Sequence, residues 1–368
     1  MIDLESHETA VLLNPRLPAV EVEETRRRVE RARAPEGLVW LATSGSRGPG
    51  KLVGLRREAL LASAAAVNTH LGAGADDTWL LALPTFHVGG LGILARAHLS
   101  GARAVEPFGD DGWSAARFLG AARTEDCRLS ALVPTQLFDL VEHGERCPES
   151  LRAIVIGGGR LDGTLYDRAR GLGYPVLPSY GLTECASQVA TAAPDAGPDL
   201  RILDHVDVRV ADSGRFELRS PSLLEGYLHL TPEGDLFHDP KSRGWFETED
   251  RGEIDRGALR IHGRDGSFVK VGGESVLLDR LEAILEAARR RHAPESDAAL
   301  IADENARLGR CVALVVPRDL REPAVSALRD AFDAEVLPFE RIRRVHRVER
   351  IPRSPLGKLR LAELRALL

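Results

Sequence analysis

PVLPSYGLTE, residues 175–184, joins a short apolar run to a polar segment that ends in a carboxylate. The apolar run is typical of a buried strand, and helical periodicity separates it from most of the similar runs before it. Those runs are residues 80–83, 102–105, 129–133 and 153–156. This alternation predicts βαβ units and a largely parallel sheet. Because ligands bind beyond the carboxyl ends of such strands, the polar segment is a candidate site.

The segments before and between these runs supply further elements. Residues 37–42 are predicted to form a buried strand, and residues 20–33 and 56–71 have helical periodicity. Residues 78–95 carry no charged side chain, but they contain a proline and several glycines. That mixture favours a buried strand, a turn and the start of a buried helix over a membrane span.

The pattern changes after about residue 200. Residues 206–210 and 215–219 alternate apolar and polar side chains around Asp212-Ser213-Gly214, which predicts a hairpin. A polar turn at residues 263–266 is the candidate hinge. After it the sequence predicts helices at 277–291 and 325–332, strands at 298–302 and 311–316, and a basic tail. The predicted fold is α/β. A large N-terminal domain, residues 1–263, has layered, mostly parallel sheets, helices and a small β-subdomain, and a small α+β domain follows at residues 264–368.

Composition narrows the classes of function. The chain has 368 residues, a net charge of −6 and a pI near 6.0, so nucleic acid is not expected as the main partner. Its four cysteines form no CxxC pair, which argues against zinc and disulfide frameworks and fits a reducing compartment. The first residues lack the pattern of a signal peptide. These features predict a cytoplasmic protein without a membrane span.

Lysine is scarce. Only four of the 49 basic residues are lysines, namely Lys51, Lys241, Lys270 and Lys358. They could be chance leftovers of a bias toward arginine, or they could stand where a compact ammonium group is needed.

Two motifs suggest a phosphate site. TSGSRGPGK, residues 43–51, follows a predicted strand and could bring backbone N–H groups and a lysine to a phosphate, although such loops are often plain turns. In residues 179–184, Tyr180 could stack on a base, Thr183 could bind phosphate and Glu184 could hold Mg²⁺. The alternative is a strand-to-loop turn with a surface acid.

Three further motifs are individually weak. PTFHVGG, residues 84–90, places His87 beside glycines that allow close approach of a ligand, although such a histidine is more often a core group. GWFETED, residues 244–250, ends in Asp250, which could accept hydrogen bonds from ribose hydroxyls or stand at a hairpin corner. In IPRSPLGK, residues 351–358, proline and glycine bracket Lys358, as on an ordered loop.

The order of these motifs resembles that of the adenylate-forming superfamily of acyl-CoA synthetases, peptide-synthetase adenylation domains and luciferases. The resemblance runs from about residue 40 to residue 360. Within the superfamily, residues 83–91 and 180–191 are most similar to o-succinylbenzoate–CoA ligases of menaquinone biosynthesis. The resemblance implies ATP, Mg²⁺ and coenzyme A as ligands, a carboxylate substrate and a mobile C-terminal domain. It leaves a homodimer as an open possibility.

The resemblance assigns roles to residues of this chain. Lys358, His87 and Thr183 would be catalytic, and His87, Ser187 and Gln188 would face the acyl substrate. Glu184 would hold the metal. Phosphate contacts would come from Thr43, Ser44, Gly45, Ser46 and Lys51. The remaining nucleotide and CoA contacts would come from Gly157, Gly158, Gly159, Ser179, Tyr180, Gly181, Asp250, Arg264, Lys270, Gly272 and Gly273. Three of the four lysines thus fall on family motifs.

Several positions depart from the family pattern. Arg47 and Gly50 change the phosphate loop, Glu249 precedes the ribose aspartate where glycine is usual, and Gly266 stands where many members have an acidic hinge residue. The stretch before the phosphate loop is also shorter than usual, which leaves part of the acyl pocket undefined.

The implied reaction has two steps. The substrate carboxylate attacks the α-phosphorus of ATP and releases pyrophosphate, and the CoA thiolate then attacks the acyl adenylate. Because two anions meet in the first step, Lys51, Lys358 and Mg²⁺ would act by neutralising charge. The alternatives are a ligase for another aryl or acyl substrate, and an adenylate-forming module that does not use free CoA.

Overall fold

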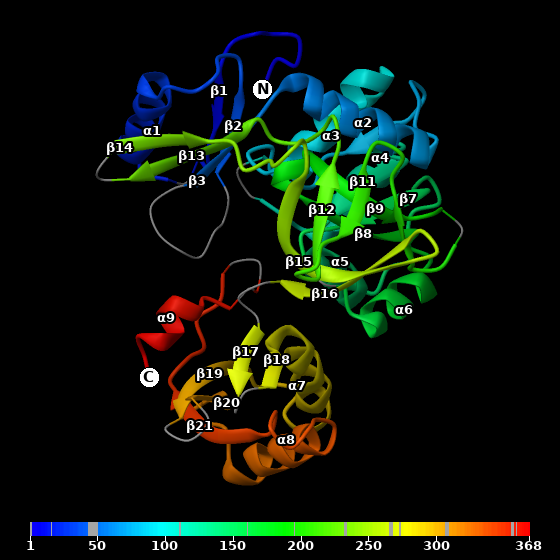
Figure 1. The fold of residues 1–368 in the computed structure, drawn as a ribbon. Helices are drawn as coiled ribbons and strands as arrows, with labels where there is room; N and C mark the ends of the chain where they lie inside the picture. The colour runs from blue at the N-terminus through cyan, green and yellow to red at the C-terminus, as the bar shows by residue number, and fades with distance from the viewer. Residues whose placement is uncertain are drawn as a thin grey trace. The chain divides into compact units, whose positions relative to one another are not determined.

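The computed structural model describes residues 2–15, 17–42, 51–109, 112–159, 161–194, 196–231, 234–264, 268–271, 274–305, 309–354, 357 and 359–368. The chain forms two compact units (Figure 1). The large unit comprises Met1–Ala211, Phe216–Thr248 and Ile254–Arg260, and the small unit comprises Asp212–Arg215, Glu249–Glu253 and Ile261–Leu368. The predicted domain boundary after Gly263 stays a prediction.

The main sheet has eleven strands in the order β11-β12-β15-β16-β10-β9-β8-β7-β6-β4-β5. Its parallel part confirms the predicted βαβ alternation. The parallel strands are β4 (Thr78–Leu80), β5 (Arg103–Val105), β6 (Leu129–Leu132), β7 (Ala153–Ile156) and β8 (Val176–Leu182). The helices among them are α2 (Arg57–Leu71), α3 (Val88–Ser100), α4 (Ala115–Thr124), α5 (Pro134–His143) and α6 (Gly163–Gly171).

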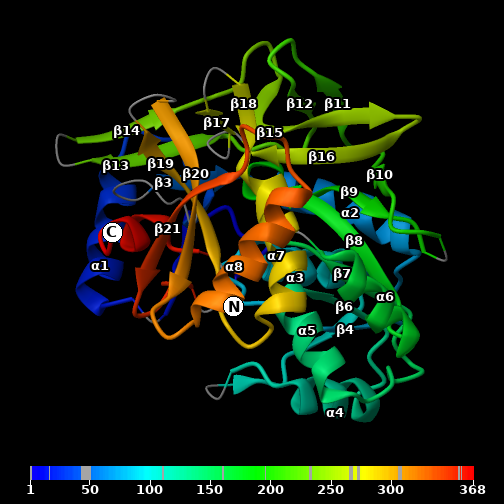
Figure 2. The same cartoon turned by 90° about the horizontal axis from the view of Figure 1, so that it is seen from below.

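Helices cover both faces of the parallel strands (Figure 2). Along β7, Ile154 and Ile156 pack in one core with α4, α5 and α6, whereas Ala153 and Val155 pack in another with α2 and α3. Successive side chains of a strand point to opposite faces, so a strand buried on both sides reads as a continuous apolar run. The uncharged residues 78–95 are β4, a turn and the start of α3, as predicted.

Antiparallel strands extend the sheet beyond β8. A 3₁₀ turn, η2 (Thr183–Cys185), leads from β8 into β9 (Ser187–Ala192), which pairs with β10 (Leu200–Ile202). The predicted hairpin is β11 (Asp207–Val210) with β12 (Arg215–Arg219). The other strands of this part are β15 (Phe246–Asp255) and β16 (Ala258–Arg264).

A second, five-stranded sheet lies in the large unit, in the order β1-β2-β3-β13-β14. Its strands are β1 (Ala10–Leu12), β2 (Val39–Ala42), β3 (Lys51–Leu55), β13 (Gly226–Thr231) and β14 (Gly234–His238). Helix α1 (Ala19–Arg31) buries only Val29 among its residues, which agrees with its highly charged sequence. Among the described residues, no helix combines the length and apolar character that a membrane span needs.

The small unit has a three-stranded sheet, β19-β20-β21, and a two-stranded sheet, β17-β18. Its strands are β17 (Phe268–Val271), β18 (Glu274–Leu277), β19 (Ala299–Asn305), β20 (Gly309–Pro317) and β21 (Ile342–Val348). Helices α7 (Leu278–His292) and α8 (Glu322–Ala334) pack on one face of the larger sheet, and α9 (Leu361–Arg365) packs on the other.

The segment predicted as a basic tail contains two elements that were not predicted, β21 and α9. Ile342 and Val348, at the two ends of β21, are buried and fix the strand to the core. Between them, Arg344 forms an ion pair with Asp303 of β19. Three arginines of this basic segment, Arg343, Arg344 and Arg347, therefore lie on a paired strand.

Candidate active site

Glu184, Tyr227 and Lys51 meet beyond the carboxyl end of β8. The Tyr227 hydroxyl donates to Glu184 Oε1 at 3.0 Å, and Lys51 Nζ lies 3.9 Å from the same oxygen. The ammonium also lies 4.0 Å from the centre of the Tyr227 ring, within the range of a cation–π interaction. Because Glu184 is only 7% exposed, this cluster presents a largely desolvated carboxylate with one neutral hydrogen-bond donor and one cation beside it.

Strand pairing explains why these residues meet. In the antiparallel pair of β3 and β13, Tyr227 is opposite Val53 and His229 is opposite Lys51. Lys51 and Tyr227 are therefore diagonal neighbours on one face of the sheet. The chain just before β13 is tied to η2, because the Leu224 N–H donates to the Glu184 carbonyl at 2.8 Å. Burial, followed by the charge of Lys51, lowers the pKa of His229.

Lys241, the lysine without a family role, binds the backbone just before β13. Its Nζ donates to the Leu224 and Glu225 carbonyls at 2.7 and 3.0 Å and lies 2.8 Å from Asp239 Oδ1. The three N–H donors of one small ammonium match these three acceptors. The planar guanidinium of arginine spreads its donors over three nitrogens and could not reach all three acceptors from a single atom. Lys241 thus has structural contacts that favour lysine over arginine.

Arg96 is a buried cation that is not among the predicted site residues. It lies on α3, is 1% exposed, and donates from Nη2 to Ser187 Oγ at 3.3 Å. Within the described residues, its Nε and Nη1 have no hydrogen-bond partner. Burial lowers the pKa of Arg96 to about 10, so it stays charged at neutral pH. A buried guanidinium with unused donors is costly on its own and suited to a ligand carboxylate.

The backbone is strained between Glu184 and the Arg96 contact. Ala186 has φ of +47° and Ser187 has φ of +113°, and neither is glycine. A Cβ on Gly181 would lie 1.9 Å from the Ser187 carbonyl oxygen, so only glycine allows β8 to approach this turn. Strain of this kind is concentrated at functional sites. The strained turn holds Glu184 and Ser187, three residues apart in the sequence, in a fixed relative position.

Several predicted residues lie along β7, β8 and β9. The Ser179 hydroxyl bonds to Thr191 Oγ1 at 2.9 Å, and Thr191 Oγ1 donates to the side-chain oxygen of Gln188. Gly157, the first residue after β7, lies beside Ser179, because a Cβ there would be 4.0 Å from the Ser179 carbonyl oxygen. Gly158 has φ of +74°, and Gly159 follows it.

Tyr180 and His87 each pack against another ring of the large unit. The Tyr180 ring is mostly buried and packs at 6.2 Å from the Phe216 ring. His87 stands at the N-cap of α3, is exposed, and lies 4.5 Å from the Phe86 ring. Gly90 packs against the Leu83 and Pro84 carbonyls, where a Cβ would lie 2.4 Å away. Chain packing alone therefore requires glycine at this position, and the approach of a ligand beside it stays a prediction. Contacts of Tyr180 with a base and of His87 with the acyl group stay predictions.

Most of the other predicted contact residues lie partly or wholly outside the described residues. Thr43, Ser44, Gly45, Ser46, Gly272, Gly273 and Lys358 are outside them. Arg264 and Lys270 have described backbones on β16 and β17. Asp250 lies on β15, in the stretch assigned to the small unit. The roles of all these residues stay predictions.

The carboxylate of Glu184 fits a magnesium ion that is bound together with a nucleotide. Mg²⁺ commonly takes one or two carboxylates, several waters and the substrate's phosphates. No group of three or more His, Cys, Asp or Glu side chains that could hold a metal occurs among the described residues. The described residues therefore contain no magnesium site built from protein side chains alone.

Comparison with known proteins agrees with this chemistry. The model of the AMP-binding enzyme family matches residues 3–228. The chain belongs to the family of AMP-binding enzymes. The superfamily resemblance inferred from the motifs is thereby confirmed, and so is the α/β fold.

Relatives within the family carry more specific names. The chain is 34% identical over 273 residues to the 2-succinylbenzoate–CoA ligase of Salmonella typhimurium, covering 74% of this chain and 57% of that protein. The enzyme of that name from Bacillus velezensis is 30% identical over 284 residues, covering 73% and 56%. The chain thus spans just over half the length of these curated relatives.

A solved structure shows the same fold over most of the chain. It is o-succinylbenzoate CoA synthetase from Bacillus subtilis in complex with the acyl-adenylate intermediate OSB-AMP. It superposes with a TM-score of 0.80 at 23% identity and covers 97% of this chain and 83% of that chain.

Two residues of the site were missed from the sequence, and both left a signal. Arg96 directly follows the uncharged residues 78–95 and lies on an otherwise apolar helix, so its burial could have been predicted. Tyr227 lies on an alternating strand, but its approach to Glu184 depends on two segments more than forty residues apart in the sequence. Sequence spacing alone does not bring those together.

Proposed function

We propose that this protein is an ATP-dependent acid–CoA ligase that converts o-succinylbenzoate to o-succinylbenzoyl-CoA through an acyl adenylate. The observation that carries the proposal is the buried Arg96–Ser187 pair, three residues along the chain from the Glu184 cluster. The names of the relatives and the family membership support the same reaction.

The reaction balances in two steps. A carboxylate oxygen of the acid bonds to the α-phosphorus of ATP, and pyrophosphate leaves. The CoA thiolate then bonds to the acyl carbon, and AMP leaves. Lys51 would neutralise the phosphates and Lys358 the reacting carboxylate. Glu184 would hold Mg²⁺, which supplies further positive charge to the phosphates when bound.

The substrate explains the buried cation. o-Succinylbenzoate carries two carboxylates, of which one reacts. The other needs donors in a site that also accepts an aromatic ring. Arg96 offers unused N–H groups, and the Ser187 hydroxyl can donate a hydrogen bond as well. A substrate with a single carboxylate would leave this buried charge unpaired, which predicts discrimination against it.

The test compares o-succinylbenzoate with 4-oxo-4-phenylbutyrate, which lacks the ring carboxylate. ATP–pyrophosphate exchange and thioester formation are measured for each acid. We expect o-succinylbenzoate to be favoured by about ten- to a hundredfold in kcat/KM. Arg96→Met should abolish that preference, whereas Arg57→Met, which removes another buried arginine of the same unit, should leave it. Equal use of both acids by the unaltered protein would contradict the proposed substrate.

The same assay separates the alternatives. Adenylation of a different aryl or acyl acid would identify another CoA ligase. Adenylate formation without transfer to free CoA would identify a module that passes its product elsewhere. We also propose a cytoplasmic location, since all four cysteines are free thiols. A homodimer is part of the proposal, and sedimentation at micromolar concentration checks it.

A further inference from the structure

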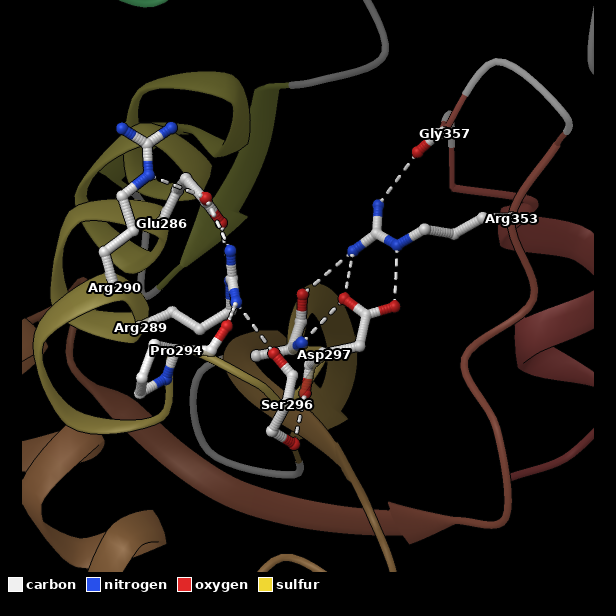
Figure 3. Close-up of polar contacts among 9 residues, drawn as sticks. Glu286, Arg289, Arg290, Pro294, Ser296, Asp297, Arg353 and Gly357 are labelled. Carbon is white, nitrogen blue, oxygen red and sulfur yellow. Dashed lines mark hydrogen bonds and ion pairs between the residues drawn. The ribbon is translucent and has the colours of Figure 1, made fainter. Parts of the chain in front are cut away.

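Arg353 links the start of β19 to the loop that leads to Lys358 (Figure 3). Its Nε and Nη2 donate to the two oxygens of Asp297, each at 2.7 Å. Nη2 also donates to the Ala298 carbonyl at 3.0 Å, and Nη1 donates to the Gly357 carbonyl at 3.1 Å. All these groups belong to the small unit, and together they engage all three nitrogens of the guanidinium.

The loop itself is closed at its base. Arg353 and Leu359 form an antiparallel bridge, and the Arg360 N–H donates to the Pro352 carbonyl at 2.9 Å. Inside the loop, the Gly357 N–H donates to the Ser354 carbonyl at 2.8 Å. Gly357 has φ of +75°, a conformation that side chains other than glycine disfavour. Gly357 is therefore held by its N–H and by its carbonyl.

The other end of the contact is fixed to α7. Arg289 donates to the Pro294 and Ser296 carbonyls at 2.9 and 2.8 Å, and its fork pairs with Glu286. Arg290 donates to Glu286 as well, at 3.0 Å. Figure 3 shows these side chains leading from the helix to Asp297. Asp297, whose carboxylate binds Arg353, therefore follows a turn that is hydrogen-bonded to α7.

We infer that Arg353, oriented by Asp297, is a positioning residue for Lys358. The inference rests on the proposed function, in which Lys358 acts in adenylation. The Gly357 carbonyl belongs to the peptide bond that joins Gly357 to Lys358. A hydrogen bond to this carbonyl fixes the plane of the peptide group from which residue 358 continues.

The energetics favour orientation over stability as the role of this pair. The side chains of Arg353 and Asp297 are 35% and 36% exposed. Ion pairs with such exposure contribute little to folding. A bidentate arginine does, however, specify direction, because its donors lie in one rigid plane. Lysine at this position would keep the charge and lose that geometry.

Hydrogen exchange of the full chain without substrates tests the positioning itself. We compare the unaltered protein with Arg353→Lys and Asp297→Asn, following the amides of residues 352–362. Both variants should exchange the Gly357 amide about tenfold faster. Arg344→Lys is the matched control, because it removes an exposed arginine–aspartate pair elsewhere in the small unit. Unchanged exchange in both test variants would overturn the inference whatever the substrate is.

Half-reaction kinetics test the consequence for Lys358. In both variants kcat for pyrophosphate exchange should fall by about ten- to a hundredfold, with the ATP KM nearly constant. Thioester formation from supplied acyl adenylate should stay within about twofold of the unaltered protein. Equal losses in both half-reactions would indicate a merely structural role and overturn the inference. If the unaltered protein does not adenylate o-succinylbenzoate, the proposed function fails, and the exchange measurement still decides whether Arg353 orients the loop.

Discussion

Lys51 Nζ lies over the Tyr227 ring while the hydroxyl of the same tyrosine donates to Glu184, so one side chain contacts both charges of the site. The ring faces the cation and the polar end faces the anion. Because the ammonium is also 3.9 Å from Glu184 Oε1, Tyr227 holds two opposite charges near each other. This relationship allows the ring and the hydroxyl to be tested separately.

Tyr227→Phe removes the hydroxyl and keeps the ring. The buried Glu184 carboxylate loses a donor, so we expect the free energy of unfolding to fall by about 1.5–3 kcal/mol and the KM for MgATP to rise. Tyr227→Leu should raise that KM further, since the face under Lys51 is lost as well. Chemical denaturation and pyrophosphate exchange measure the two effects.

Tyr174→Phe is the control for Tyr227→Phe. Tyr174 is fully buried in the large unit, and its hydroxyl donates to the Glu145 carbonyl at 3.0 Å. The control should lower stability and leave the KM for MgATP unchanged. A similar rise of KM in both variants would mean that Tyr227 acts only through stability.

Glu184→Gln keeps the size of the side chain and an oxygen for the Tyr227 hydroxyl, but it removes the charge. We expect about a tenfold higher Mg²⁺ requirement for pyrophosphate exchange, because a neutral amide is a poorer magnesium ligand. The melting temperature should change little. Glu225→Gln, which removes an ion pair with Arg56 nearby, serves as control. A Mg²⁺ titration that matches the unaltered protein would remove Glu184 from the metal role.

Lys241→Met tests the support behind Glu184. The Leu224 and Glu225 carbonyls lose their shared donor and Asp239 loses its partner, so stability should fall by about 1–3 kcal/mol. Because Leu224 bonds to the Glu184 carbonyl, the KM for MgATP should rise too. Lys241→Arg should rescue little, since a flat fork does not reproduce three donors at one point. Full rescue by arginine would show that charge alone is needed there.

The sequence predicts the central strands well because local pattern and tertiary burial agree there. The run at 153–156 matches β7 residue for residue, since a strand covered on both faces needs only apolar side chains. The strand β21 was missed for the opposite reason. Its pairing with β20 is set by two buried anchors, Ile342 and Val348, and its charged residues conceal them.

For the site, the types of functional residue could be predicted from the sequence, but their contacts in space could not. Glu184 and Lys51 were chosen from motifs, and the structure brings them together. Tyr227 comes from a strand that the phosphate and carboxylate motifs do not include. Arg96 pairs with Ser187 only because α3 crosses the end of β9, a contact between residues 91 positions apart. Such pairs depend on packing, which local patterns do not record.

His205 gives the large unit a pH-dependent stability. It lies between β10 and β11, and neither ring nitrogen has a hydrogen-bond partner among the described residues. Burial lowers the pKa of His205 to about 4, although Asp204 nearby acts in the other direction. In the unfolded chain the ring takes up a proton near its ordinary pKa of about 6.5, so the unfolded state binds more protons between these values. The contribution of His205 is thus fully present above about pH 6.5 and is lost as the pH falls toward 4, by about 3 kcal/mol in all.

The measurement is chemical denaturation at several pH values between 4 and 7.5, using the unaltered protein, His205→Leu and the exposed-site control His98→Gln. His205→Leu keeps an apolar side chain of similar bulk and cannot take up a proton. Its stability should therefore fall less steeply below pH 6.5 than that of the unaltered protein. The control should follow the unaltered protein over the whole range. Parallel curves for all three proteins would show that His205 is not the group responsible, and the acid lability would then be assigned to paired carboxylates such as Asp77, whose pKa is lowered by its hydrogen bond with Arg152 against the effect of burial.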